Sequence, residues 1–156
     1  MIIRGLDDTD QPILLYAAKA ALLSISVGGL VGIVIGSFFS SVGARPQEEG
    51  DPLALMVSLL LVVPMVETAL MAPLLALILK RVSNRYAACV ISALMWALIH
   101  SCFWIYWGLF VFFPFLVFSF CFLAWSRIST RRAILVTALA HMIHNLGPTM
   151  LMVYGA

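Results

Sequence analysis

Long apolar stretches, separated by short breaks, run through most of the chain. Three breaks are polar, "GARPQEEGD", "KRVSNR" and "SRISTRR", and a fourth, "SCFWIYWG", is aromatic and uncharged. Each apolar stretch is close to or above the roughly 20 residues that a helix needs to cross a bilayer. The aromatic break suits a tight turn at the lipid–water boundary, where Trp and Tyr are enriched. The pattern predicts five transmembrane helices, at 12–41, 52–79, 86–103, 105–125 and 133–153.

Composition supports this prediction. Of the 156 residues, 63% are hydrophobic and 10% are charged. A soluble domain of this size has too little interior to hide so much apolar surface. We therefore predict an all-α, polytopic protein of the cell membrane, built as a five-helix bundle in the lipid bilayer. The net charge of +2 is too small to indicate a nucleic-acid partner, and the oligomeric state is left open.

Basic residues are distributed unequally between the two ends of the predicted helices. With five spans, the N-terminus, the 80–85 loop and the 126–132 loop share one side of the membrane. That side carries eight of the nine Lys and Arg residues, and Arg45 alone lies on the other. The positive-inside rule therefore predicts a cytoplasmic N-terminus and a C-terminus outside. The eight are Arg4, Lys19, Lys80, Arg81, Arg85, Arg127, Arg131 and Arg132.

The first and fourth predicted helices are interpreted as structural. The chain begins with the acidic segment "MIIRGLDDTDQ" instead of a basic signal-peptide region, so we expect the first helix to be retained as an anchor. In it, Gly28, Gly32 and Gly36 recur every four residues, and this stripe favours close packing within the bundle over a dimer interface. The fourth helix is bulky on all sides and has no ionisable group, so we expect a lipid-facing wall.

The three cysteines, Cys89, Cys102 and Cys121, all fall in apolar stretches. This placement predicts small buried hydrophobic residues and not a disulfide framework. Cys102 is close to His100 in the chain and is a candidate nucleophile, although a cysteine near a helix end is more often inert.

A few polar residues interrupt the apolar pattern of the other three helices. Glu67 is an acidic residue inside a predicted span, and all three histidines are intramembrane. At a rise of about 1.5 Å per residue, Glu67, His100 and Asn145 lie about 20, 22 and 20 Å from the basic residues that flank their helices. His141 lies about 14 Å deep by the same count. Polar groups without a partner are costly inside the bilayer. Because these four side chains lie at a similar depth, we predict that they share one water-accessible cavity.

The types of residue in this cluster suit hydrolysis. A carboxylate can take a proton from water, imidazoles can orient that water, and a carboxamide can donate to an oxyanion. His141 and Asn145 are four apart and share one side of a helix. His144 is rotated by about 60° from His141 about the helix axis, and it is expected either to support the cluster or to point at a neighbouring helix. Glu67, His100 and His141 also match a zinc ligand set with an open position, so both mechanisms remain open.

Three short motifs have the order and spacing of a known family. They read "ETALMA" at 67–72, "WALIH" at 96–100 and "HMIHN" at 141–145. Together they resemble the marks EExxxR, FxxxH and HxxxN of the CPBP family of intramembrane proteases, also called the CAAX-protease or Abi family. The resemblance covers about 60–153, so we expect a catalytic helical core there. Residues 1–59 then form an N-terminal segment with the first helix and the start of the second.

The resemblance implies an intramembrane endopeptidase that cuts a peptide bond in or beside the bilayer. It implies that Glu67 and His100 activate water, while His141 and Asn145 hold the oxyanion. The implied substrate is a peptide or a segment of a membrane protein. No cofactor is required by these residues, but zinc, held by Glu67, His100 and His141, is left open as a possible one.

The first motif departs from the family pattern at two positions. Thr68 stands where the second Glu belongs, and Ala72 stands where the Arg belongs. Here Thr68 and His144 are the residues expected to support the catalytic side chains, and weakened support of this kind commonly costs activity. The alternative function is therefore a catalytically impaired relative that acts as a membrane scaffold or immunity-type binding protein. A third hypothesis, a proton-coupled or solute-binding protein, lacks the internal repeats usual in transporters.

Overall fold

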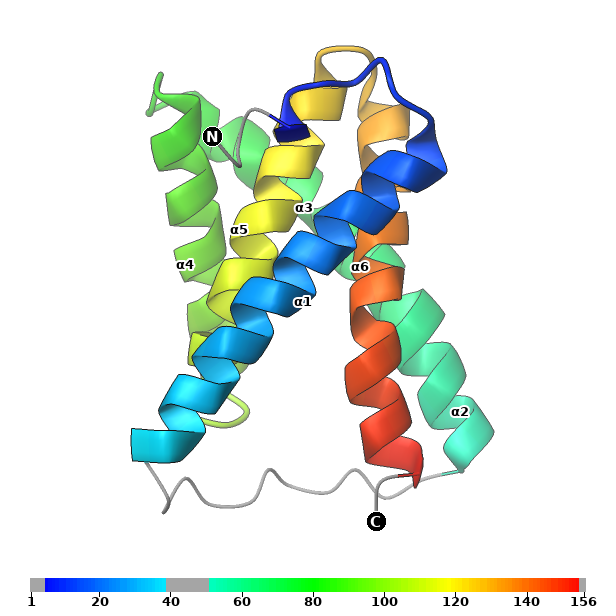
Figure 1. The fold of residues 1–156 in the computed structure, drawn as a ribbon. Coiled ribbons are helices and arrows are strands. Elements are labelled where there is room, and N and C mark those ends of the chain that lie inside the picture. The colour runs from blue at the N-terminus through cyan, green and yellow to red at the C-terminus, as the bar shows by residue number, and fades with distance from the viewer. Residues whose placement is uncertain (1–4, 39–50, 155–156) are drawn as a thin grey trace.

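Five helical rods run between the two ends of the molecule (Figure 1). The structure, a computed structural model, describes residues 5–38 and 51–154, and every regular element in these ranges is helical. The all-α bundle predicted from the sequence is confirmed. The elements are α1 (Ile13–Phe38), one continuous rod of α2 (Pro52–Val57), the π-helical turn η2 (Ser58–Val62) and α3 (Val63–Leu79), then α4 (Arg85–Ser101), α5 (Trp107–Ser126) and α6 (Thr130–Tyr154).

The helices begin where the sequence offers capping groups. The Asn84 side chain accepts hydrogen bonds from the backbone N–H groups of Tyr86 and Ala87, and it thereby caps α4. Asp51 accepts from the N–H of Ala54 at the start of α2. Such caps satisfy backbone donors that have no partner within the helix. At the aromatic break, α4 ends and α5 begins two residues away from the predicted positions, and α6 begins at Thr130, three residues before its predicted start.

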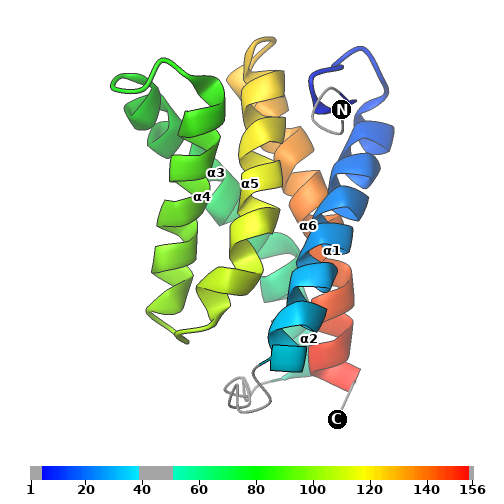
Figure 2. The ribbon, with the colours of Figure 1, turned by 60° about the vertical axis from the view of Figure 1, so that its left-hand side comes forward.

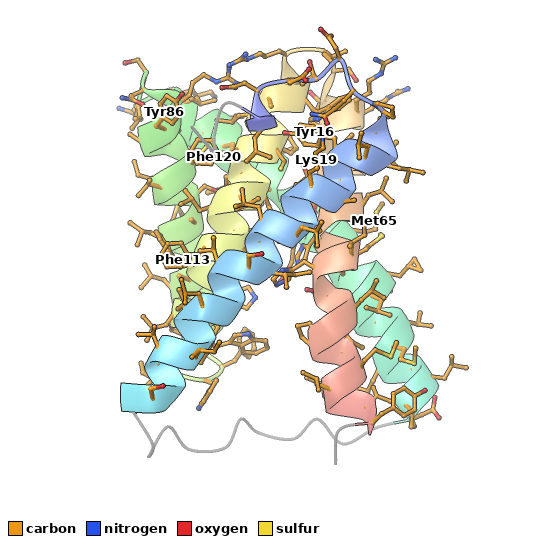
Figure 3. The ribbon with its side chains drawn as sticks, in the orientation of Figure 1. Tyr16, Lys19, Met65, Tyr86, Phe113 and Phe120 are labelled. Atoms are coloured by element: carbon orange, nitrogen blue, oxygen red, sulfur yellow. The ribbon has the colours of Figure 1, made fainter. Side chains whose placement is uncertain are left out.

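Four of the rods are long and apolar enough to cross a membrane, and α4, at 17 residues, is shorter. Their outer surfaces are apolar. Leu22 of α1 is 63% exposed, and Leu98 of α4 is 67% exposed. Met65 and Tyr86 are also exposed, as Figure 3 shows. Apolar side chains on the outside of a bundle are what a lipid environment requires. The chain is therefore a multi-pass membrane protein.

α5 lies at the centre of the bundle, so the prediction of a lipid-facing wall is wrong. It packs between α4 on one side and α1 and α6 on the other (Figure 2). Phe115, Phe118 and Phe122, along its length, are all buried. The physical reason is simple. A helix that is apolar on every side can be covered by protein or by lipid, and its sequence does not distinguish the two.

Two glycines of the predicted stripe lie against α5. A Cβ on Gly28 would be 3.7 Å from Pro114, and a Cβ on Gly32 would be 3.6 Å from Phe110. Both are ordinary packing distances within one chain. The prediction of internal packing is therefore confirmed for these two residues, while the surroundings of Gly36 lie outside the described part.

The two ends of the bundle differ in charge. One end, here called the basic end, consists of residues 5–12, the α3–α4 connection and the α5–α6 connection (Figure 1). Asp7 and Arg127 form an ion pair across it at 3.5 Å. The opposite end consists of the start of α2, the turn between α4 and α5, and the last turns of α6. The Lys and Arg residues that the structure describes lie at or next to the basic end: Lys19, Lys80, Arg81, Arg85, Arg127, Arg131 and Arg132.

Candidate active site

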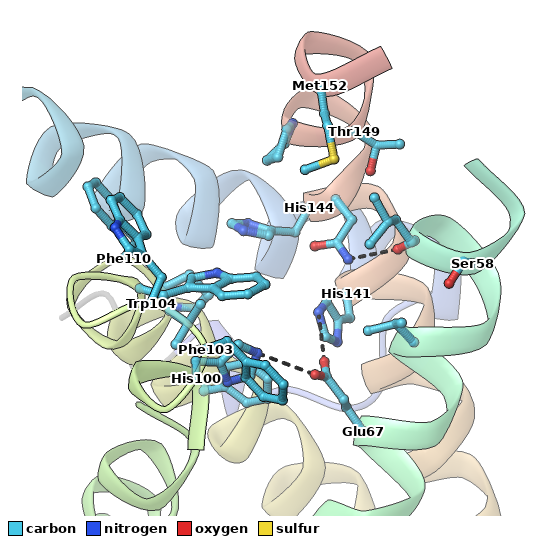
Figure 4. Close-up of a pocket in the computed structure, with 18 residues that line it drawn as sticks. Ser58, Glu67, His100, Phe103, Trp104, Phe110, His141, His144, Thr149 and Met152 are labelled. Carbon is cyan, nitrogen blue, oxygen red and sulfur yellow. Dashed lines mark hydrogen bonds and ion pairs between the residues drawn. The ribbon is translucent and has the colours of Figure 1, made fainter. Parts of the chain in front are cut away.

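Glu67 of α3 lies between two histidines from two other helices (Figure 4). Its Oε1 is 3.4 Å from Nε2 of His100 in α4, and its Oε2 is 3.6 Å from Nε2 of His141 in α6. The exposed fractions of the three side chains are 16%, 12% and 6%, in that order. Each carboxylate oxygen therefore faces a different imidazole in a largely buried setting.

The backbone of α4 fixes the tautomer of His100. Its Nδ1 lies 2.8 Å from the carbonyl oxygen of Trp96, one turn earlier. A carbonyl oxygen can only accept, so Nδ1 carries the hydrogen, and Nε2 of the neutral ring is an acceptor. Nε2 faces a carboxylate oxygen, which is also an acceptor when Glu67 is ionised. A proton, or a water that donates to both, is therefore needed between His100 and Glu67.

Aromatic rings of α5 hold the two histidines. Phe115 contacts both, with ring centroids 5.3 Å from His100 and 5.6 Å from His141. Phe118 stacks on His141 at 4.5 Å, and Trp107 meets His100 edge-on at 5.2 Å. Sequence reasoning missed these residues, because nothing in a uniformly bulky and apolar helix distinguishes the rings that face a site.

Asn145 of α6 joins that helix to the second rod. Its Nδ2 donates to the carbonyl oxygen of Leu59 at 2.9 Å, and Leu59 lies in η2. Turns of this type are rare and often occur at functional sites. In a straight α-helix, each residue is rotated about the helix axis by about 40° relative to the residue four positions earlier. The wider turn of a π-helix reduces this rotation. η2 therefore helps Leu59, Val63 and Glu67 to line the same cavity. One N–H of the amide remains for another acceptor.

His144 lines the cavity and also binds α1. Its Nδ1 is 2.9 Å from Oγ of Ser24, which is fully buried. The sequence left two roles open for His144, and this hydrogen bond corresponds to the second, a contact with a neighbouring helix. Ser24 was not identified from the sequence. The signal that could have found it is its spacing, because Ser24, Gly28 and Gly32 form one stripe of small residues at intervals of four.

Two residues considered in the sequence lie away from the cavity. Thr68 is fully buried in α3, does not line the cavity, and its Oγ1 has no hydrogen-bond partner among the described residues. Cys102 is exposed, and its Sγ donates to the carbonyl oxygen of Leu98 at 3.4 Å. The prediction of a buried thiol is therefore wrong for Cys102, because α4 ends just before it. Cys89 and Cys121 are buried, free thiols as predicted.

A cavity of about 620 Å³ joins the polar residues. Glu67, His100, His141, His144 and Asn145 all line it, so the structure brings these predicted residues together from three helices. Figure 4 shows Trp104 and Phe110 across the cavity from Ser58. The aromatic and apolar wall comes from the α4–α5 turn and from α5, and it includes Phe103, Trp104, Trp107, Phe110, Pro114 and Phe115.

The geometry also bears on the zinc hypothesis. In the part of the chain that the structure describes, no group of three His, Cys, Asp or Glu side chains is arranged to hold a metal ion. Glu67, His100 and His141 therefore do not fit a zinc ligand set as they stand here. The cavity lining presents one carboxylate, from Glu67, three imidazoles, from His100, His141 and His144, and one amide, from Asn145.

A multi-pass helical bundle with these groups around a cavity has the parts of an intramembrane hydrolase. The family model described as type II CAAX prenyl endopeptidase Rce1-like matches residues 49–147. The match spans more than half of the chain, so the chain belongs to this family of CAAX-type proteases, as the three motifs indicated. It includes the four predicted catalytic positions, and α1 lies outside it. Comparisons with curated proteins and with solved structures gave no match.

Proposed function

We propose that this chain is an intramembrane endopeptidase in which Glu67 acts as the general base. The observation that carries the proposal is the position of the Glu67 carboxylate, which faces Nε2 of His100 and Nε2 of His141 in a shared cavity. A carboxylate held in this way can take a proton from a water molecule placed beside it. Family membership supports a protease, and the geometry supports this assignment of the residues.

The reaction proceeds in two steps. In the first, Glu67 takes a proton from water while the water oxygen forms a bond to the carbonyl carbon of the peptide. His100 accepts a hydrogen bond at Nε2 and so orients the water or the shared proton. In the second, the proton passes from Glu67 to the leaving amide nitrogen, and the C–N bond breaks. The products are a carboxylic acid and an amine, and Glu67 returns to its starting form.

The carbonyl oxygen becomes negative in the first step and needs hydrogen-bond donors. We place the hydrogen of the neutral His141 ring on Nε2, because Nε2 faces a carboxylate oxygen that accepts. The distance of 3.6 Å exceeds a normal hydrogen bond, so this N–H remains available for the carbonyl oxygen of the substrate. The second N–H of the Asn145 amide is the other donor. His141 and Asn145 share one side of α6, which suits a joint role.

The departures in the first motif favour the alternative function, a non-catalytic relative that binds a membrane partner through the same cavity. The second Glu and the Arg are both absent, replaced by Thr68 and Ala72. Their joint replacement leaves no single charge buried without a partner, which would be costly. The two replacements therefore leave no lone charge beside Glu67, and we retain the endopeptidase as the leading function.

A cleavage assay distinguishes these functions. The purified chain is incubated in liposomes with prenylated peptides and with unmodified membrane peptides, and the products are identified by mass spectrometry. We expect cleavage that persists in the presence of a chelator. Cleavage that the chelator abolishes would indicate a metal enzyme, and no cleavage of any peptide would favour the binding protein. Cys102→Ser is the matched control and should cleave like the unchanged chain, because Cys102 does not line the cavity.

A further inference from the structure

The cavity extends from Glu67 toward one end of the bundle only. It is lined by Ser58 near the start of the second rod, by Phe103 and Trp104 in the α4–α5 turn, and by Met152 near the end of α6. Phe103 is 75% exposed and still lines the cavity, so the cavity reaches the surface there. Of the residues described at the basic end, none contributes to the lining. The mouth therefore lies at the end opposite the basic residues.

The position of the cavity mouth can be related to the two sides of the membrane. Lys and Arg residues gather on the cytoplasmic side of membrane proteins. The Lys and Arg residues that the structure describes lie at or next to the basic end, with Lys19 hydrogen-bonded to Gln11 close to it (Figure 3). Trp and Tyr prefer the lipid–water boundary. Trp104 and Tyr106, in the turn at the mouth, place the opening at that boundary on the extracytoplasmic side.

The lining also limits what can enter. Of the lining residues that the structure describes, none is Lys or Arg, and Glu67 is the one acid. Aromatic and aliphatic side chains make up most of the remaining wall, including Phe110, Val111 and Met152. A charged substrate side chain beside the cut bond would lose its water here, and the one charged group on the wall that could pair with it, Glu67, is needed as the base, so its burial is unfavourable. The lining therefore suits uncharged, apolar residues on the substrate.

We infer that the substrate is an apolar, membrane-embedded peptide segment that reaches Glu67 from the extracytoplasmic half of the bilayer. The cleavage step rests on the proposed function, whereas the direction of entry rests on the mouth of the cavity and on the charge of the two ends. The two parts are tested separately, so failure of one is distinguishable from failure of the other.

The native cysteines provide the test of direction. Cys102 is exposed in the turn at the mouth, while Cys89 and Cys121 are buried and should not react. A membrane-impermeant maleimide added to intact cells should label the unchanged chain, and Cys102→Ser should abolish the labelling. A second variant, Thr130→Cys made together with Cys102→Ser, places the thiol at the basic end. It should be labelled only after the cells are permeabilised, and the reverse pattern of the two variants would overturn the inference.

The test of substrate class uses single-span model substrates in liposomes that hold the chain in its cellular orientation. The same apolar stretch is placed near either the extracytoplasmic or the cytoplasmic end of the span. We expect at least tenfold faster cleavage of the first substrate, and a similar loss when Lys is placed beside its cut bond. Equal cleavage of both substrates, or faster cleavage of the second, would contradict the proposed entry. A chain that cleaves neither substrate nor any peptide in the assay above fails as a protease, while the labelling still reports the direction.

Discussion

Oγ of Ser24 in α1 lies 2.9 Å from Nδ1 of His144 in α6, and this contact connects a helix outside the matched family region to the cavity. His144 meets Phe118 edge-on at 5.7 Å, and Phe118 stacks on His141 at 4.5 Å. Packed side chains therefore run from α1 to the imidazole that faces Glu67. A change at Ser24 should reach the site through this series of contacts.

The first prediction concerns Ser24→Ala. The substitution removes the partner of His144 Nδ1, and hydrogen bonds of this kind between membrane helices contribute about 1 kcal/mol. We expect a lower thermal midpoint and a several-fold fall in kcat with little change in KM. Ser26→Ala is the control, because Ser26 is exposed on the same helix and should behave like the unchanged chain. An unchanged kcat for Ser24→Ala would show that α1 does not position the site.

Gly108 is the subject of the second prediction. A Cβ at this position would lie 2.5 Å from the carbonyl oxygen of Ala97, so α4 and α5 approach closely there because residue 108 is glycine. Overpacking of this kind costs about 1–3 kcal/mol. Gly108→Ala should lower the thermal midpoint and disturb the neighbouring Trp107. Gly29→Ala, with nothing within 4 Å of its added Cβ, is the matched control. Equal midpoints for the two variants would be inconsistent with this packing.

Asn145 is predicted to have both a structural and a chemical role. Asn145→Asp keeps the shape of the side chain but replaces the donor to the Leu59 carbonyl with an acceptor. Loss of an oxyanion donor typically reduces kcat by about 10²–10³. We expect a fall of that size for Asn145→Asp, together with lower stability. Ser119→Ala, which loses a 3.0 Å hydrogen bond to Ser92 away from the cavity, should lose stability but keep its rate per folded molecule. A normal kcat in Asn145→Asp would leave the amide with the structural role alone.

A substitution at Thr68 is predicted to maintain or raise stability, unlike the substitutions above. Its buried Oγ1 has no partner among the described residues, and an unsatisfied buried hydroxyl costs about 1–3 kcal/mol. Thr68→Val replaces the hydroxyl with a methyl group of similar size. The thermal midpoint should stay equal or rise, and the cleavage rate should not change. Ser92→Ala, whose hydroxyl has a partner, should lower the midpoint. A loss of cleavage in Thr68→Val would instead assign the hydroxyl the supporting role expected from the motif.

The sequence was sufficient to predict the helices and the polar residues of the site. Helix length follows from bilayer thickness, so the spans could be read from the breaks in the apolar pattern. Glu67, His100 and Asn145 stood out because ionisable and amide groups are rare and costly at that depth. Their meeting around one cavity followed from a simple count of helical rise.

The rest of the site depends on which apolar faces meet. The burial of α5, and with it the walls made by Trp107 and Phe115, follows from packing among helices that are equally apolar on all sides. Ser24 gave no signal by itself, since a serine in a membrane helix is ordinary. The exposure of Cys102 depends on a difference of two residues in the end of α4, and helix ends are the least certain feature of a sequence-based prediction.

The central claim is that the Glu67 carboxylate takes the proton from the attacking water. Glu67→Gln keeps the size of the side chain and its place between His100 and His141, but it removes the base. The direct test compares the initial rate of peptide cleavage by Glu67→Gln and by the unchanged chain in the same liposomes, after equal thermal midpoints have been established. General-base catalysis contributes about 10²–10⁴ in rate, so we expect Glu67→Gln to lose at least that much. Cleavage by Glu67→Gln at the full rate of the unchanged chain would contradict it.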